Sequence, residues 1–276
     1  YGRMNATLGV ELPFTNFNIQ TTIPLGYSDP HTEKMKDGEV QIWKITHNGV
    51  DTHPIHFHLF DVQLINRVGW DGIIRIPDEN ELGWKDTVRV SPLEDTIVAL
   101  RPLLPKAPFG VPDSIRPLNP MMPIGDATGF NNVDTNGDPI TPGITNELVN
   151  FGWEYMWHCH ILSHEEMDMM RPIILAVLNL MPAKPNPVSG ASVSPTPGSV
   201  AVQLNWTDPT PPAVLTNWGN LANEIGFKIE RATGNGPFKL IATALANQTS
   251  FLDLTVGANS VYRYRVTTYN AVGSAV

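Results

Sequence analysis

The 276-residue sequence has 18 basic and 27 acidic residues, a formal net charge of −9, and 42% hydrophobic residues. This apolar fraction excludes intrinsic disorder, and the acidic balance argues against a protein that binds nucleic acid or lies on an anionic membrane. The length suffices for one large or two ordinary domains. No stretch approaches the roughly 18 uninterrupted apolar residues that a membrane-spanning helix needs.

The hydrophobic pattern predicts an all-β protein, because runs rich in β-forming residues are common and helical periodicity is scarce. In the first part of the chain we expect strands at residues 39–46, 59–68, 86–90, 95–100, 153–160 and 172–178. In the first of these, Val40 and Ile42 point to one face and Trp43 and Ile45 to the other. We therefore expect this strand to be buried on both sides, as in a sandwich.

A long segment between Pro102 and Pro142 lacks the strand pattern and contains nine prolines. A loop of this length inside a compact domain is usually functional or poorly ordered. Residues 134–138, Asp-Thr-Asn-Gly-Asp, place oxygen atoms at alternate positions, as at the start of a calcium loop. Pro139 stands where such a loop needs glycine, so we favour a plain turn.

A second domain is expected after the Pro-rich residues 181–187, with strands at 200–206, 226–232 and 261–268. This part resembles a fibronectin type III module, and the residues that carry the resemblance are Trp206, Leu254, Tyr262-Arg-Tyr-Arg-Val266 and Asn270-Ala-Val-Gly273. The resemblance implies that Tyr262 makes the corner hydrogen bond of that family. It also implies a smaller β-sandwich over residues 183–276 with a spacer or adhesion role.

Six of the eight histidines fall into two short clusters, and the second cluster also holds the single cysteine. The clusters are His53-Pro-Ile-His56-Phe-His58 and His158-Cys159-His160-Ile-Leu-Ser-His164. Such a concentration of imidazoles around one thiol is improbable for core filling alone and indicates metal binding.

Strand geometry predicts two metal sites back to back, because side chains alternate between faces with a period of two. His158 and His160 then share one face, and Cys159 points to the other. His56 and His58 likewise share a face, and Pro54 is expected to bend the chain so that His53 turns elsewhere.

The two predicted sites differ in their ligand types. Cys159, His53 and His164 supply a thiolate and two imidazoles, and Met169 adds a thioether, which together are the ligands of a trigonal copper site with a weak axial methionine. The remaining four histidines form an all-imidazole set suited to copper that meets dioxygen. These four are His56, His58, His158 and His160.

Both motifs resemble the C-terminal cupredoxin domain of multicopper oxidases, including laccases. Trp84-Lys-Asp-Thr-Val88 also resembles a segment that follows the first histidine motif in that family. The resemblance covers roughly residues 1–181. It implies an all-β fold with a cupredoxin-like Greek-key sandwich or barrel over residues 1–182.

The resemblance also implies a copper-dependent oxidoreductase with assigned ligands. The type 1 copper would be held by His53, Cys159, His164 and Met169, the type 2 copper by His56, and the type 3 pair by His58, His158 and His160. Electrons from a phenol, an amine or a metal ion such as Fe(II), Mn(II) or Cu(I) would pass through Cys159 and its flanking histidines. Four single-electron oxidations would reduce one dioxygen molecule to two waters.

One departure from the family concerns the trinuclear cluster, which takes eight histidines there, half of them from an N-terminal cupredoxin domain. This chain supplies four, and the remaining His31 and His47 are isolated and expected to be ordinary core residues. Either the chain is a fragment of a longer oxidase, which its start at Tyr1 without a leader favours, or a second polypeptide completes the cluster. Without that partner half we expect no turnover.

Other functions stay open. The chain could be a non-enzymatic type 1 electron carrier, or a copper-storage or adhesion module. Met169 could be an ordinary core residue, whereas a nucleophilic role of Cys159 is disfavoured because the flanking imidazoles point away from its sulfur. Glu165, Glu166 and Asp168 form either a solvated turn or an acidic patch that attracts a cationic reductant. A secreted, periplasmic or cell-surface location is implied by the resemblance alone.

Overall fold

A computed structural model describes residues 6–12 and 22–276. The prediction of an all-β protein is confirmed: over these residues the helical structure amounts to one short α-helix, α1 (Leu162–Glu165), and two 3-10 turns, η1 (Glu79–Glu81) and η2 (Leu215–Asn217). The chain divides into two compact units, the first of residues 1–104 and 113–177 and the second of residues 105–112 and 178–276. This division lies near the boundary expected at residues 182 and 183, and it also assigns part of the Pro-rich segment to the second unit.

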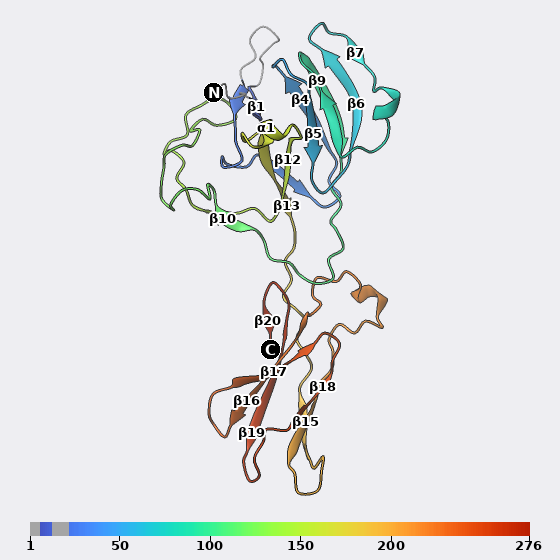
Figure 1. The fold of residues 1–276 in the computed structure, drawn as a ribbon, viewed down its shortest axis with the longest axis vertical. Helices are drawn as coiled ribbons and strands as arrows, with labels where there is room; N and C mark the ends of the chain where they lie inside the picture. The colour runs from blue at the N-terminus through green and yellow to red at the C-terminus, as the bar shows by residue number, and fades with distance from the viewer. Residues whose placement is uncertain (1–5, 13–21) are drawn as a thin grey trace. The chain divides into compact units, whose positions relative to one another are not determined.

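The first unit is a sandwich of two sheets (Figure 1). One sheet has the order β3 (Glu33–Lys36), β13 (Met170–Ala176), β12 (Trp153–Cys159), β5 (His53–Phe57) and β8 (Thr87–Val90). The other has the order β4 (Gln41–His47), β9 (Glu94–Leu100), β6 (Val62–Gly69) and β7 (Ile74–Arg75). Strand β3 runs parallel to β13, and the other neighbouring pairs of the two sheets are antiparallel. A separate hairpin joins β1 (Gly9–Glu11) to β2 (Thr22–Pro24).

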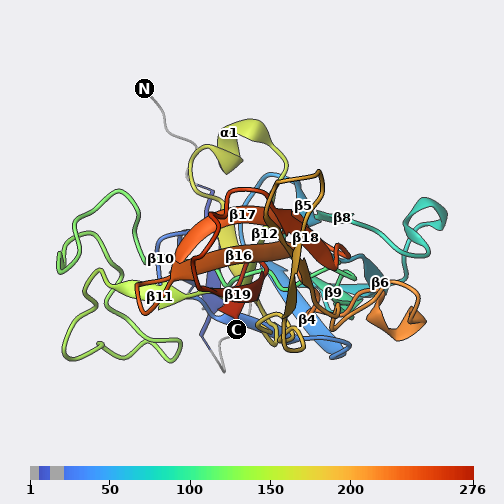
Figure 2. The same cartoon turned by 90° about the horizontal axis from the view of Figure 1, so that it is seen from below.

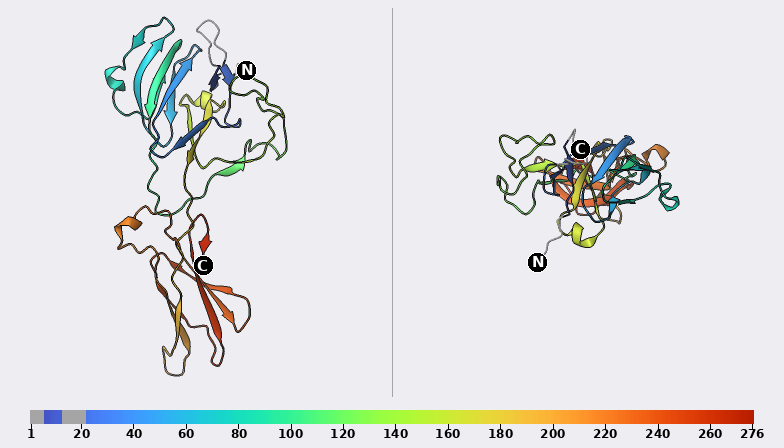
Figure 3. Two further views of the ribbon diagram at one scale, coloured as in Figure 1. Left: turned by 180° about the vertical axis from the view of Figure 1, so that it is seen from behind. Right: turned by 90° about the horizontal axis from the view of Figure 1, so that it is seen from above.

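The core of this unit lies between the two sheets and contains Ile55, Val62, Val98 and Cys159. These side chains are at most 1% exposed. They come from strands of both sheets, so the odd-numbered positions of β5 and β12, including Cys159, face the core. Figure 3 shows the blue and cyan strands of the four-stranded sheet from behind.

The expectation that residues 39–46 are buried on both faces is wrong. Trp43 and Ile45 pack against the core, but Val40 and Ile42 are 66% and 58% exposed. The physical reason is that β4 belongs to a two-layer sandwich, in which one face of each sheet packs on the other sheet and the opposite face has no layer to pack on.

The Pro-rich segment is ordered around a small core of its own. Leu118 and Phe130 of this segment pack with Phe151 and Ile174. A short strand that we did not expect, β10 (Ile115–Pro117), pairs with β11 (Leu148–Asn150), and the green loops spread beside them in Figure 2.

Two polar groups hold the loops of this segment. The buried Asn146 donates to the backbone carbonyls of Asn119 and Met122 and accepts from the amide of Asn119. Asp134 accepts hydrogen bonds from the amides of Asn136 and Asp138, which is the plain turn that we favoured over a calcium loop.

The second unit also consists of two sheets. The three-stranded sheet has the order β14 (Ser189–Val193), β15 (Ala201–Asn205) and β18 (Ser250–Asp253). The four-stranded sheet has the order β17 (Lys239–Leu245), β16 (Gly226–Thr233), β19 (Tyr262–Tyr269) and β20 (Ser274–Ala275). Trp206 packs on Phe227 between the sheets, with ring centroids 5.4 Å apart. The Tyr262 hydroxyl accepts a hydrogen bond from the Gly257 amide at 2.9 Å, a contact of the corner type.

Truncating the centre of this second core should destabilise the unit strongly. Phe227 is fully buried, so we expect Phe227→Ala to lower the free energy of unfolding by about 3–5 kcal/mol through lost burial and a residual cavity. Urea unfolding followed by tryptophan fluorescence would measure this loss, since Trp206, one of the seven tryptophans, packs on Phe227. The control Leu245→Ala removes a 73% exposed side chain and should change stability by no more than about 0.5 kcal/mol. Equal effects of both variants would contradict the packing described here.

Over residues 6–12 and 22–276, the structure contains no helix of the length and apolar character that crossing a membrane requires.

Candidate metal centre

Three potential ligand atoms converge in the interior of the first unit. The Sγ atom of Cys159 lies 3.6 Å from Nδ1 of His53 and 3.6 Å from Nδ1 of His164, and these two nitrogens are 3.1 Å apart. All three side chains are buried. They come from the end of β12, the start of β5 and the short helix α1. The structure thus brings together three residues that are up to 111 positions apart in the chain, and we call them the cysteine group.

Strand register explains why His53 belongs to this group. Strand β5 is regular from its first residue, since His53 pairs with Val90 and Pro54 with Arg89 in β8. The expectation of a bend at Pro54 is therefore wrong. His53 and His56 are an odd number of residues apart, so alternation alone turns them to opposite faces of the sheet.

The chain after β12 folds back over the cysteine group. Helix α1 returns His164 to Cys159, and the Ile161 amide points at Sγ of Cys159 at 3.4 Å. The Met169 amide then donates to the His164 carbonyl, and the Met169 carbonyl accepts from the Cys159 amide. Met169 is 5% exposed and lines the same cavity of about 650 Å³ as His53 and His164. Its side chain therefore shares a cavity with two members of the group, and its role as a fourth ligand stays a prediction.

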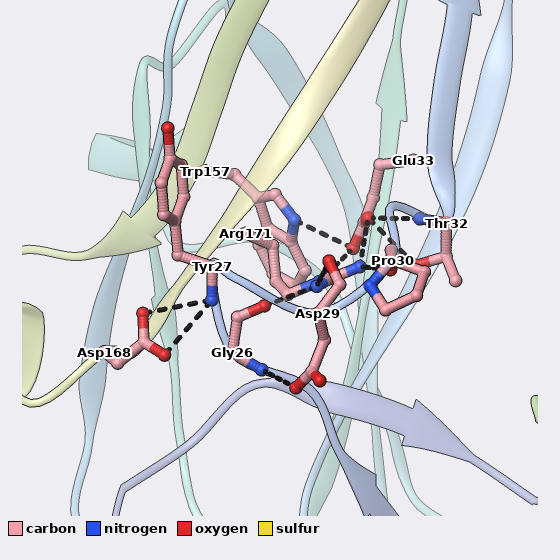
Figure 4. Close-up of polar contacts among 9 residues, drawn as sticks. All are labelled: Gly26, Tyr27, Asp29, Pro30, Thr32, Glu33, Trp157, Asp168 and Arg171. Carbon is pink, nitrogen blue, oxygen red and sulfur yellow. Dashed lines mark hydrogen bonds and ion pairs between the residues drawn. The ribbon is translucent and has the colours of Figure 1, made fainter. Parts of the chain in front are cut away.

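Polar contacts on both sides of Met169 fix this return (Figure 4). The Tyr27 amide donates a bifurcated hydrogen bond to the two carboxylate oxygens of Asp168, at 3.0 and 3.2 Å. The fully buried Arg171 donates to the carbonyls of Gly26 and Pro30 and forms an ion pair with Glu33. The segment that carries Met169 is thereby tied to residues 26–33.

The surroundings of His53 and Cys159 favour the neutral forms of these two side chains in the absence of a cation. Burial, with the neighbouring His47 and His164, lowers the pKa of His53 to about 4, so its imidazole keeps a free lone pair at neutral pH. Burial also raises the pKa of the Cys159 thiol, although the Ile161 amide opposes this effect. A thiolate at this position therefore needs a bound cation.

Copper fits the cysteine group. A point equidistant from the three ligand atoms lies about 2 Å from each of them, which is close to ordinary metal–nitrogen and metal–sulfur bond lengths of ~2.0–2.3 Å. One thiolate, two imidazoles and a nearby thioether are the donor set of an electron-transfer copper site.

A second group of imidazoles lies on the other face of the same sheet. His158 pairs with His56 across β12 and β5, and ligand atoms of His56, His58 and His158 lie within 4.8 Å of one another. The Nε2 atoms of His58 and His158 are 3.2 Å apart. We call these three residues the histidine group. The exposed His160 lies beside it, with its ring centroid 4.7 Å from that of His56 and 4.8 Å from that of His158.

Hydrogen bonds to backbone carbonyls orient the rings of His56 and His158 in the histidine group. Nδ1 of His56 lies 2.9 Å from the Asp86 carbonyl, and Nδ1 of His158 lies 3.1 Å from the Cys159 carbonyl. Because a carbonyl can only accept, these nitrogens carry protons, and the Nε2 atoms keep their lone pairs as in metal-binding histidines. Burial and the neighbouring His158 also lower the pKa of His58, which favours its neutral form.

The three acidic residues after His164 have different surroundings. Asp168 is bound by the Tyr27 amide, and a carboxylate oxygen of Glu165 lies 3.5 Å from Nδ1 of His158. Glu166 is exposed. Two of the three carboxylates therefore make contacts within the chain, and the acidic patch that attracts a reductant stays a prediction.

The two histidines that we considered isolated differ. His31 lies outside both groups and contacts the edge of Phe151, at 5.6 Å between ring centroids. His47, in contrast, stacks on His53 at 4.8 Å with an angle of 25° between the rings. His47 is a buried core histidine, as expected, but the sequence did not predict its contact with His53. The signal that could have found it is the short, turn-forming connection of residues 48–52, which returns the chain from one strand directly to the next.

Comparisons with known proteins point to one family. A family model described as "Multicopper oxidase" matches residues 4–106, which include the first histidine cluster. A laccase of Bacillus subtilis (strain 168) is 28% identical over 160 residues, covering 53% of this chain and 22% of the laccase. A laccase of Haloferax volcanii is 29% identical over 138 residues, covering 50% of this chain and 16% of the laccase.

Among solved structures, the McoA multicopper oxidase from the hyperthermophile Aquifex aeolicus is 22% identical with a TM-score of 0.33, covering 56% of this chain and 22% of that one. The chain thus spans about a fifth of the length of the proteins that it resembles. Copper is the cofactor that multicopper oxidases use, and both groups of side chains could bind it. Residues 4–106 therefore match the multicopper oxidase family, and the relatives of this chain include laccases.

Proposed function

We propose that this chain is the C-terminal part of a multicopper oxidase, which takes single electrons from a reducing substrate and reduces dioxygen to water. The observation that carries the proposal is the placement of two adjacent residues. Cys159 belongs to the cysteine group on one face of β12, and His158 belongs to the histidine group on the other. The backbone between them is a short covalent path that joins the two groups.

The proposed roles follow the sequence prediction. His53, Cys159, His164 and Met169 would hold the type 1 copper, His56 the type 2 copper, and His58, His158 and His160 the type 3 pair. Copper bound there would supply one-electron redox chemistry. The protein favours the neutral forms of His53 and His58, excludes water from Cys159 by burial, and orients His56 and His158 by hydrogen bonds to carbonyl groups.

The histidine group and His160 provide half of the ligands that a trinuclear cluster needs in this family. The other half would come from N-terminal cupredoxin domains of the same protein or of another chain. The reductant would be a phenol, an amine or a metal ion such as Fe(II), Mn(II) or Cu(I), and the protein would work outside the cytoplasm. The second unit would be a fibronectin type III-like spacer, which its sheets of three and four strands and the Tyr262 contact support.

Oxygen consumption and copper content test this proposal. The chain alone, loaded with copper, should show intense thiolate-to-copper absorption but consume no oxygen with a phenol or Fe(II), because half of the oxygen-reducing cluster is missing. The protein expressed with its upstream coding region should consume oxygen and contain about four coppers. Oxygen consumption by the chain alone would contradict the half-cluster assignment.

A non-enzymatic electron carrier is the second candidate, and it is favoured by one observation. The cysteine group is complete within this chain, whereas the histidine group needs further ligands in the oxidase. One copper and no oxygen consumption in the protein with its upstream region would support the carrier. Absence of the thiolate-to-copper absorption would leave a copper-storage or adhesion module.

A further inference from the structure

The His47 ring is held in place by its own loop. The Gly49 amide donates to Nδ1 of His47 at 2.8 Å, and Nε2 of His47 donates to the Asp51 carbonyl. His47 is the last residue of β4, and its backbone pairs with Glu94 in β9. With both nitrogens engaged, the buried ring of His47 has no lone pair to offer a metal.

The face of this ring lies against His53. The two rings are nearly parallel, with centroids 4.8 Å apart and an angle of 25° between them. In the described part of the chain, the polar contacts of the His53 ring are made by Nδ1, which faces Cys159 and His164. A metal-binding histidine usually has its ring orientation fixed by a hydrogen bond from its other nitrogen. At His53 the stacked ring of His47 takes the place of such a hydrogen bond.

We propose that His47 is a positioning residue of the cysteine group, whose fixed ring holds the His53 imidazole with Nδ1 aimed at Cys159 and His164. This inference rests on the proposed copper-binding role of that group. Preorganised ligands lose less conformational freedom when the metal binds, so the stack should raise copper affinity without contributing a ligand.

Gly49 offers a second way to move the ring without changing either histidine. A Cβ atom added at Gly49 would lie 2.8 Å from Cε1 of His47, which is too close for both atoms to stay in place. The ring cannot yield without losing its hydrogen bonds or its stack. Gly49→Ala should therefore reproduce, in weaker form, the effect of removing the ring.

The test compares variants of the full chain by Cu(II) affinity in competition with a chelator, by the thiolate-to-copper absorption and by electron paramagnetic resonance. We expect His47→Gln to lower the affinity about 10–100-fold, as for other residues that orient metal ligands, and to alter the spectrum. His47→Phe keeps a ring for stacking but loses both hydrogen bonds to the loop, so it should recover part of the affinity and give a spectrum closer to that of wild type than His47→Gln does. Val50→Ala, at an 88% exposed position of the same loop, is the matched control and should behave as wild type.

Crystal structures of the metal-free variants give an independent readout, the orientation of the His53 ring. We expect this ring to turn away from Cys159 in His47→Gln and to stay in place in His47→Phe. An unchanged affinity and spectrum in His47→Gln, or a loss in His47→Phe as large as in His47→Gln, would overturn the proposal. A wild-type chain without the thiolate-to-copper absorption would instead contradict the proposed function, and the metal-free structures would still decide whether His47 orients His53.

Discussion

Cys159→Ser is expected to abolish the intense visible absorption of the copper-loaded chain. Cys159 is the single cysteine, and its buried sulfur faces both His53 and His164. Serine has a similar shape and can hydrogen bond to the two imidazoles, so the fold should persist. Its hydroxyl, however, does not ionise to replace the thiolate, and the thiolate is the ligand that produces the intense absorption of this type of copper site.

Absorption spectra and copper analysis of the two proteins would measure this effect. The histidine group lies on the opposite face of β12, so copper held there should remain in Cys159→Ser. Leu162→Ala, which truncates a 67% exposed side chain on α1, is the control and should keep the absorption. A serine variant that retained the band would show that another donor produces it, and the assignment of the cysteine group would be wrong.

Arg171→Met should cause the largest loss of stability in the first unit, about 3–5 kcal/mol. The Arg171 guanidinium is fully buried, donates to the carbonyls of Gly26 and Pro30, and pairs with Glu33 (Figure 4). Methionine fills part of the volume but takes the positive charge away from Glu33 and one donor each from the carbonyls of Gly26 and Pro30 in the interior. Urea unfolding of the metal-free chain would measure the difference.

Two further variants give this prediction its controls. Arg75→Met removes an exposed ion pair with Asp71 and should cost no more than about 1 kcal/mol. Arg171→Lys keeps the charge but cannot reach several acceptors in a planar fork, so its loss should fall between the other two. If Arg171→Met and Arg75→Met were equally stable, the buried network would have no role in holding residues 26–33.

The sequence allowed much of the fold to be predicted. The strand expected at residues 95–100 is β9 (Glu94–Leu100), and the one expected at 226–232 is β16 (Gly226–Thr233). Such runs are recognisable because their alternation and their flanking turn residues are local properties. Burial is less local: Ile42 is apolar, but its exposure depends on which face of β4 the second sheet covers.

Contacts between distant residues were the part that local patterns could not supply. Asp168 looked like a free acidic side chain, but Tyr27, 141 residues away, binds its carboxylate. The Pro-rich segment offered few strand signals, yet Leu118 and Phe130 find partners outside it in Phe151 and Ile174. In each case the partner is chosen by the packing of the whole unit.

The sequence by itself determined which side chains could bind metal and that neighbours along a strand must face opposite ways. Both are properties of residue type and backbone geometry, and they separate Cys159 from His158 before any fold is known. Only the tertiary structure set the distances between Cys159 and the two histidines predicted to join it, because these depend on the register between β5, β8 and β12 and on the turn of α1. It also placed His47 on His53, since that contact depends on how a short loop connects two sheets.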